Sequence, residues 1–203
     1  MPHAIQDDVR LWQWSRSDYY RAAELGLFDP DDHLELLEGE IIQRMSPHKT
    51  THSTSVLFTQ SALAEIARKQ GCHIRAQLPI TLNDRSEPEP DVQVILGTIK
   101  DYAYHHPAPA EIRLLIEVSD STLLTDRGRK ALAYAREGIN DYWIINLIDR
   151  QLEVFRDPGT LSTDSDYKTR QILHEGDTIA PLFAPESVIA VADLLPPMPT
   201  EAP

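Results

Sequence analysis

Apolar residues recur along the chain at two spacings, which predicts alternating helices and strands. Residues 51–70 and 123–137 carry apolar side chains three and four positions apart, as in amphipathic helices, and glycines follow at 71 and 138. Residues 17–27 repeat this spacing more roughly. Residues 91–96 alternate between apolar and polar, whereas residues 112–118 form a nearly unbroken apolar run. Such a run is typical of a central strand that is covered on both faces.

Shorter patterns predict further strands. Residues 34–42 form two apolar runs around Glu38-Gly39, where glycine supplies the positive φ of a tight hairpin. Residues 76–82 alternate moderately, residues 142–147 and 151–156 predict a second hairpin, and residues 169–173 predict a short strand. The prediction is an α/β fold with a mixed sheet of five or six strands, helices on its faces and peripheral hairpins. We expect one domain over residues 1–195 and a disordered proline-rich tail over 196–203.

Composition and charge narrow the class of protein. The chain has 203 residues, 41% of them hydrophobic, and a single cysteine, Cys72. These values are ordinary for a globular protein and exclude a disulfide-stapled module. No stretch reaches the roughly 18 apolar residues of a membrane span, so we expect a soluble, cytoplasmic protein without membrane contact.

The net charge of −13 argues against a general nucleic-acid coat protein. The acidic excess is confined to the two ends of the chain, however. Residues 1–40 carry 10 acidic and 3 basic side chains and residues 157–203 carry 8 and 2, while residues 41–156 carry 14 of each. A functional site in the middle of the chain therefore need not face a negative field.

A carboxylate at the end of the most apolar strand is the first candidate for chemistry. Glu117 closes the run that begins at Ile112, and glutamate is rarely buried without a partner. A structural reading is that it caps the next turn or pairs with Arg113. The alternative is a metal site, because Asp91 at the head of a neighbouring strand would supply a second carboxylate. Hard cations such as Mg²⁺ or Mn²⁺ favour oxygen ligands of this kind.

The helix that follows this strand adds basic residues. Lys130 lies 13 residues after Glu117, early in that helix, where it could fold back over the strand end. The same stretch has a local excess of positive charge that could bind phosphate, through Arg127 and Arg129 in particular.

An ordered series of short motifs resembles the Uma-two family of endonucleases, a branch of the PD-(D/E)XK restriction-endonuclease-like superfamily. The likeness covers roughly residues 15–195. The motifs are Glu35-Leu-Leu-Glu-Gly-Glu-Ile, Met45-Ser-Pro, His52, Gln77-Leu-Pro-Ile, Pro90-Asp91, Glu117-Val118-Ser119, Asp126, Lys130 and Gly138-Ile-Asn-Asp-Tyr-Trp-Ile-Ile. Each motif is weak alone, but their order and spacing together are specific.

The resemblance implies a nuclease core with Asp91 and Glu117 as metal ligands and Lys130 as the catalytic lysine. The sequence departs from the superfamily's simplest pattern, in which the lysine stands two residues after the glutamate, because that position holds Ser119. Lys130 is the expected replacement, provided that it does not point into solvent.

The family also suggests secondary site residues from the amino-terminal half. A further glutamate near the metal is expected from the early hairpin, with Glu40 preferred over Glu35. Gln77 could reach a metal-bound water or could mark a polar strand edge, and His52 could contact phosphate or cap its helix.

The expected function is a Mg²⁺-dependent (or Mn²⁺-dependent) endodeoxyribonuclease that acts on DNA as a homodimer, since two related sites suit the two strands of a duplex. The alternative is a non-catalytic binding or accessory protein that keeps the nuclease fold.

Overall fold

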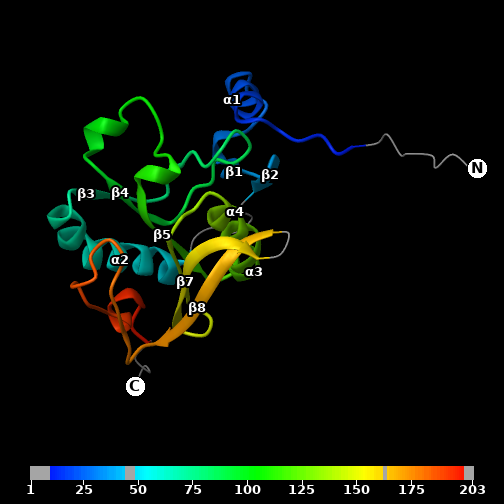
Figure 1. Ribbon diagram of the computed structural model, residues 1–203. Coiled ribbons are helices and arrows are strands. Elements are labelled where there is room, and N and C mark those ends of the chain that lie inside the picture. Colours follow the sequence, from blue (N-terminus) through cyan, green and yellow to red (C-terminus); the bar gives the residue numbers. More distant parts are fainter. Residues whose placement is uncertain (1–9, 44–48, 162–163, 199–203) are drawn as a thin grey trace, which may run out of the picture.

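The computed structural model describes residues 10–43, 49–161 and 164–198, and its centre is a six-stranded mixed sheet (Figure 1). The strand order is β3-β4-β5-β6-β7-β8, and only β5 and β6 run parallel. The strands are β3 (Cys72–Arg75), β4 (Val92–Leu96), β5 (Ile112–Ser119), β6 (Asp141–Asn146), β7 (Gln151–Leu161) and β8 (Asp164–His174).

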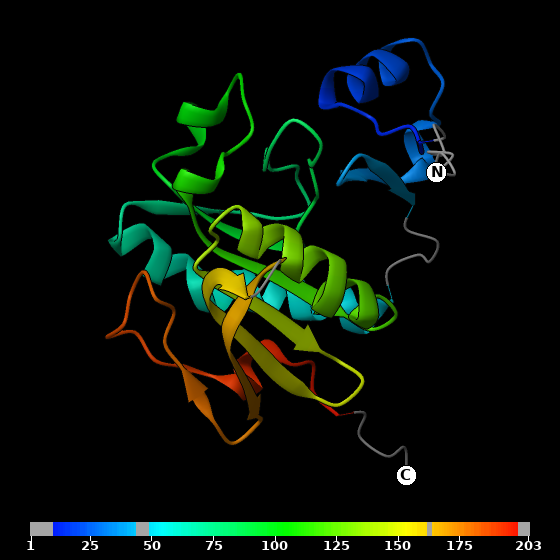
Figure 2. The same cartoon turned by 45° about the vertical axis from the view of Figure 1, so that its right-hand side comes forward.

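Helices cover both faces of this sheet, as Figures 1 and 2 show. The long helix α2 (Thr50–Lys69) packs on one face, where its residues Val56 and Leu63 belong to the same apolar cluster as Val94 and Leu114 of the sheet. The other face is covered by a helical segment in three parts: α3 (Leu123–Thr125), the π-helical turn η4 (Asp126–Lys130) and α4 (Ala131–Arg136).

The side-chain alternation of β5 explains how one strand serves two cores. Leu114, Ile116 and Val118 belong to the α2 side, whereas Leu115 belongs to the α4 side together with Tyr142. Glu117 lies two positions after Leu115, on the same face of the strand, and therefore faces α4. Every residue of β5 except Arg113 is buried, so the expectation of a central strand with two covered faces is confirmed.

A smaller amino-terminal unit lies beside the main sheet. It comprises α1 (Arg16–Glu24), the 3-10 turn η1 (Pro30–Asp32) and the hairpin of β1 (Leu34–Leu37) and β2 (Glu40–Gln43). Glu38 and Gly39 form the predicted tight turn, with φ of 54° and 79°. A Cβ on Gly39 would lie 2.8 Å from Gln13 Cβ, so this turn requires glycine for space as well as for φ.

Short elements complete the fold. The 3-10 turns η2 (Ile99–Tyr102) and η3 (Pro109–Glu111) lie between β4 and β5, and β9 (Thr178–Ile179), β10 (Ile189–Ala190) and η5 (Val191–Leu194) follow the long hairpin. None of the described helices has the length and apolarity needed to cross a bilayer.

One predicted strand is wrong. Residues 76–82 are irregular, and the edge strand lies earlier, at Cys72–Arg75. Gln77 adopts a φ of 51°, which ends the extended conformation, and Pro79 has no N–H to donate to a ladder.

The carboxy-terminal hairpin is longer than predicted. β7 continues past Pro158-Gly159 to Leu161 and β8 begins at Asp164, whereas the predicted strands covered only residues 151–156 and 169–173. The two strands pair over their full length, so the backbone ladder sets this conformation despite the polar composition. Of the expected tail at 196–203, residues 199–203 lie outside the described residues, as does the Met45-Ser-Pro motif.

Candidate active site

Neighbouring strands bring the two expected metal ligands together. Val92 of β4 pairs with Ile116 of β5, so the next position along each strand sets Asp91 opposite Glu117. Both residues are 2% exposed. Asp91 Oδ2 accepts a hydrogen bond of 2.8 Å from the Val118 N–H, which fixes this carboxylate at the end of the strand pair.

Lys130 points into the interior and contacts two carboxylates. Its Nζ lies 3.0 Å from Glu117 Oε1 and 3.1 Å from Glu35 Oε1, and the side chain is 4% exposed. The other Glu35 oxygen accepts a hydrogen bond of 3.1 Å from the Glu89 N–H. Of the two early glutamates, the structure thus brings Glu35 into this cluster. We call Glu35, Asp91, Glu117 and Lys130 the carboxylate–lysine cluster.

Two further residues of the same helical segment support the cluster, and sequence reasoning had given them no site role. Tyr134 donates a hydrogen bond of 2.9 Å to Glu117 Oε1. Asp126 is buried and accepts hydrogen bonds from Ser119 Oγ at 2.6 Å and Thr122 Oγ1 at 2.5 Å. The available signal was the four-residue spacing of Asp126, Lys130 and Tyr134, which places all three on one helix face.

His52 reaches Asp91 from α2, the helix on the face of the sheet opposite α4. It lies in the first turn of α2, is 4% exposed, and its Nε2 lies 3.2 Å from Asp91 Oδ2. An Nε2–H donor orients the Asp91 carboxylate, which then accepts from His52 and from the Val118 backbone with the same oxygen.

The structure places the remaining candidates outside the cluster. Glu40 is exposed and forms an ion pair of 2.9 Å with Arg129. Arg127 binds Glu153 through two hydrogen bonds, of 2.8 and 2.5 Å. The Gln77 residue is exposed, and its backbone N–H donates to the carbonyl oxygens of Pro90 and Asp91. It therefore holds the chain that carries Asp91.

The expected structural pairing of Glu117 with Arg113 can now be compared with the contacts of Glu117. Arg113 donates to the carbonyl oxygens of Ala110 and Ile112 rather than to Glu117. The partners of Glu117 are Lys130 and Tyr134. The condition that Lys130 should not point into solvent is met.

Burial dominates the electrostatics of the site. It raises the pKa of Glu117 to about 8, against the opposing effect of Lys130 and with further increases from the charges of Asp126, Asp91 and Glu35. Burial likewise raises the pKa of Asp126, although Lys130 and the Ser119 hydroxyl oppose this shift. These shifts show that additional positive charge would stabilise the ionised carboxylates.

The chemistry of the donors fits a divalent cation. Glu117 Oε1 accepts from both Lys130 and Tyr134, whereas Oε2 has no hydrogen bond from any described residue. Across the described ranges, no group of three or more His, Cys, Asp or Glu side chains is arranged to hold a metal. A site of two carboxylates, Asp91 and Glu117, would suit Mg²⁺, because this cation commonly binds one or two carboxylates and takes its other ligands from water and phosphate.

Comparison with solved structures defines the class of fold. The structure is similar to the crystal structure of "a putative nuclease belonging to DUF820" from Anabaena variabilis, with a TM-score of 0.64 and 20% sequence identity over 84% of this chain and 94% of that chain. The mixed six-stranded sheet and its flanking helices therefore form a nuclease-type α/β fold, as expected.

The chain belongs to the Uma2 family. The family model, described as "Putative restriction endonuclease", matches residues 16–192, nearly the whole chain. The resemblance seen in the sequence motifs is confirmed by this match. No curated protein matches the chain.

Proposed function

We propose that this protein is a divalent-metal-dependent endonuclease that hydrolyses phosphodiester bonds in DNA at the carboxylate–lysine cluster. The observation that carries the proposal is the position of Asp91 opposite Glu117, with Lys130 Nζ 3.0 Å from Glu117 Oε1. Family membership and a nuclease-type fold support this class of reaction.

Asp91 and Glu117 would hold Mg²⁺ or Mn²⁺, which supplies charge neutralisation at phosphate and lowers the pKa of water. The chain's own groups orient these ligands. His52 and the Val118 N–H fix one Asp91 oxygen, and Tyr134 fixes one Glu117 oxygen. Preorganised ligands lose little conformational entropy when the cation and substrate bind.

Lys130 has two roles in the proposed reaction. Its ammonium lies between the carboxylates of Glu35 and Glu117, and its charge lowers the pKa of Glu117 against the larger opposing effect of burial. It would also offer a hydrogen-bond donor to a phosphate bound at the cluster, where negative charge would increase in the transition state. In this way Lys130 would replace the lysine that the superfamily's simplest pattern has at the position of Ser119.

Plasmid cleavage in MgCl₂ tests these roles. We expect Asp91→Asn, Glu117→Gln and Lys130→Met each to lower the cleavage rate by about 100-fold or more. Glu65→Gln is the matched control, because Glu65 is an exposed α2 carboxylate with only surface ion pairs. Unchanged cleavage by the Asp91 and Glu117 variants would refute the assignment.

Calorimetric titration of MgCl₂ provides a second readout. The wild type should bind Mg²⁺, and Asp91→Asn should remove the binding heat. A folded wild-type protein that neither binds Mg²⁺ nor cleaves DNA would instead favour a non-catalytic binding protein with a nuclease fold.

The proposed form that cuts a duplex is a homodimer, because each chain contributes one cluster and a duplex has two backbones. Sedimentation at micromolar concentration measures this directly. A single 23 kDa species would rule the dimer out.

A further inference from the structure

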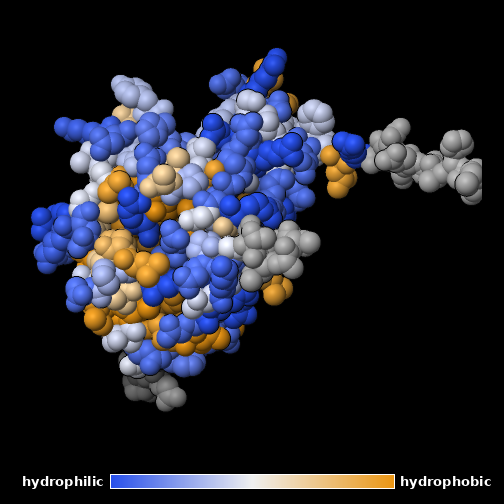
Figure 3. Space-filling view, in the orientation of Figure 1, coloured by the Kyte–Doolittle hydropathy of each residue, from blue (hydrophilic) through white to orange (hydrophobic). Residues whose placement is uncertain are grey.

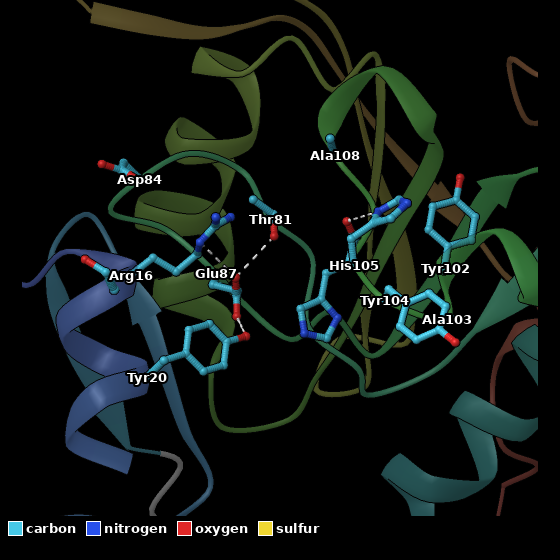
Figure 4. Close-up of a pocket in the computed structure, with 12 residues that line it drawn as sticks. Arg16, Tyr20, Thr81, Asp84, Glu87, Tyr102, Ala103, Tyr104, His105 and Ala108 are labelled. Atoms are coloured by element: carbon cyan, nitrogen blue, oxygen red, sulfur yellow. Dashed lines mark hydrogen bonds and ion pairs between the residues drawn. The ribbon is translucent and has the colours of Figure 1, made fainter. Parts of the chain in front are cut away.

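A pocket of about 730 Å³ lies between α1 and the 102–108 loop, outside the carboxylate–lysine cluster (Figure 4). Its volume lies in the range of pockets that bind small organic ligands. Helix α1 contributes Arg16, Ser17 and Tyr20 on one side. The opposite side is formed by Tyr102, Ala103, Tyr104, His105, His106 and Ala108.

The floor of the pocket is a buried carboxylate whose position is fixed. Glu87 is 4% exposed and accepts hydrogen bonds from the hydroxyls of Tyr20 and Thr81, the latter at 3.1 Å. Arg16 Nε lies 3.5 Å from the same carboxylate. Figure 4 shows Arg16, Tyr20 and Thr81 converging on Glu87.

The opposite wall presents aromatic rings that are already positioned. The Tyr102 hydroxyl donates to the Leu96 carbonyl at 2.7 Å, and its ring lies 5.4 Å from His73 and 5.3 Å from His105. Tyr104 is fully exposed in the same wall. A lone exposed tyrosine is ordinary, but a tyrosine in a pocket wall beside an ordered aromatic pair is a surface on which a planar ring can stack.

The charge of the lining selects against a bare phosphate. Two carboxylates, Asp84 and Glu87, outnumber the single guanidinium of Arg16. Burial lowers the pKa of His106, so this imidazole is neutral at pH 7 and adds no positive charge. A neutral planar ligand with hydrogen-bonding edges suits aromatic walls and a mixed polar floor better than an anion does.

The pocket is joined to the proposed active site by a short extended segment. Glu87 in the floor and Asp91 in the cluster are four positions apart in the sequence, which places their Cα atoms within about 14 Å. Between them, the Glu89 N–H donates to Glu35 of the cluster. A ligand in the pocket is therefore close enough to belong to the same DNA strand as a phosphate at the cluster.

We propose that this pocket binds an unpaired nucleobase of the DNA strand that is cleaved, stacked on Tyr104 and facing the polar floor formed by Arg16 and Glu87. The inference rests on the proposed nuclease function. It assigns the enzyme a preference for DNA in which a base near the cleavage point is out of the duplex.

The test compares two labelled duplexes in EDTA, where cleavage is blocked. One contains a single unpaired thymidine and the other an abasic residue at the same position. Fluorescence anisotropy should show about five- to tenfold tighter binding of the thymidine duplex by the wild type. Tyr104→Ala should reduce this ratio to near one, whereas Tyr104→Phe should retain it because the ring remains.

Ile99→Ala is the matched control, because Ile99 is 75% exposed on the neighbouring 3-10 turn and does not line the pocket. Equal affinity of the wild type for the two duplexes, or a ratio unaffected by Tyr104→Ala, would overturn the pocket assignment. Mg²⁺-dependent cleavage without base discrimination would overturn the pocket alone. Base discrimination without cleavage would overturn the proposed hydrolysis alone.

Discussion

At the scale of single residues, the central problem is a buried negative cluster. Glu117 and Asp91 lie in the interior with Glu35 and Asp126 nearby, and Lys130 is the buried ammonium among them. Burial raises the pKa of Glu117 to about 8, so in the metal-free protein this side chain binds a proton over much of the neutral range. A divalent cation would displace that proton, which couples metal binding to pH.

The first prediction separates the two early glutamates. Glu35→Gln should lower the rate of plasmid cleavage by about 10- to 100-fold, because it removes one of the carboxylates that orient Lys130. Glu40→Gln should stay within about twofold of the wild type, since Glu40 is exposed and contacts Arg129 at the surface. Thermal unfolding of both variants checks that each is folded. An equal loss of cleavage in the two would contradict the geometry.

The sequence predicted best which residues lie in the site. Glu117 stood out because a carboxylate ended an apolar strand, and Lys130 because it followed on the next helix. Tyr134 was not predicted, since a buried tyrosine in an apolar helix looks like a core residue until its hydroxyl partner is known. The preference for Glu40 over Glu35 had no physical signal, because both lie on one short hairpin and only tertiary packing distinguishes them.

At the scale of elements, the helical segment after β5 determines the geometry of the cluster. Its middle turn, Asp126–Lys130, is π-helical, and such wider turns often occur at functional sites. Ser119 at the end of β5 and Thr122 both donate to Asp126, which anchors this turn to the strand. The turn delivers Lys130 to Glu117 from 13 positions away in sequence.

Long elements were predicted well and irregular ones were not. The helix at 51–70 and the strand at 112–118 are confirmed to within one residue because their periodicity is strong. The predicted strand at 76–82 failed because its alternation does not reveal the positive φ at Gln77. The π-helical turn could not be predicted, since over five residues the side-chain spacing of a π-helix differs little from that of an α-helix.

The second prediction concerns a cross-element ion pair and its pH dependence. Burial alone would raise the pKa of Glu153 on β7, but hydrogen bonds from Arg127, Asn146 and Gln151 hold this pKa below its usual value. A depressed carboxyl pKa stabilises the folded state above the unfolded value of about 4.3, and this stabilisation is lost as the pH falls through the folded value. Glu153→Gln should therefore destabilise the protein at pH 7 by about 1–2 kcal/mol.

Thermal unfolding measures this effect. For a chain of this size the loss corresponds to a Tm about 2–8 °C lower at pH 7, and the difference from the wild type should shrink below about pH 4. Glu65→Gln is the control, because its partners Arg68 and Lys69 form only exposed pairs. A difference that is as large at pH 4 as at pH 7 would assign the effect to packing rather than to charge.

At the scale of the whole molecule, the uneven charge has a structural role that the sequence did not reveal. The basic residues of the 123–136 segment looked like a phosphate-binding surface, yet each contacts a carboxylate. The pairs are Arg127–Glu153, Arg129–Glu40, Lys130–Glu35, Lys130–Glu117 and Arg136–Glu38. Three of these carboxylates belong to the acidic first 40 residues, so part of that acidity attaches the amino-terminal hairpin to the helix.

The surface also bears on how DNA would approach. Figure 3 shows a mostly hydrophilic upper half, over α1 and the 97–108 loop, and more apolar side chains lower on the same face. With the basic residues of the 123–136 segment paired and a net charge of −13, long-range attraction cannot supply the affinity for a polyanion. Local contacts must do so, at the cluster and in the pocket lined by Tyr104.

The third prediction follows from this dependence of DNA binding on local contacts. In EDTA and about 0.1 M salt, the protein should bind a short duplex weakly, and MgCl₂ should tighten binding by about tenfold. A cation held by Asp91 and Glu117 would attract the DNA phosphate that these carboxylates repel in its absence. Stopped-flow anisotropy, read before product accumulates, measures both affinities. Asp91→Asn should abolish the tightening, and Glu65→Gln should preserve it. Equal affinity of the wild type in EDTA and in MgCl₂ would mean that the cluster does not attach DNA through a metal, and that an acidic protein of this fold holds its substrate by some other surface.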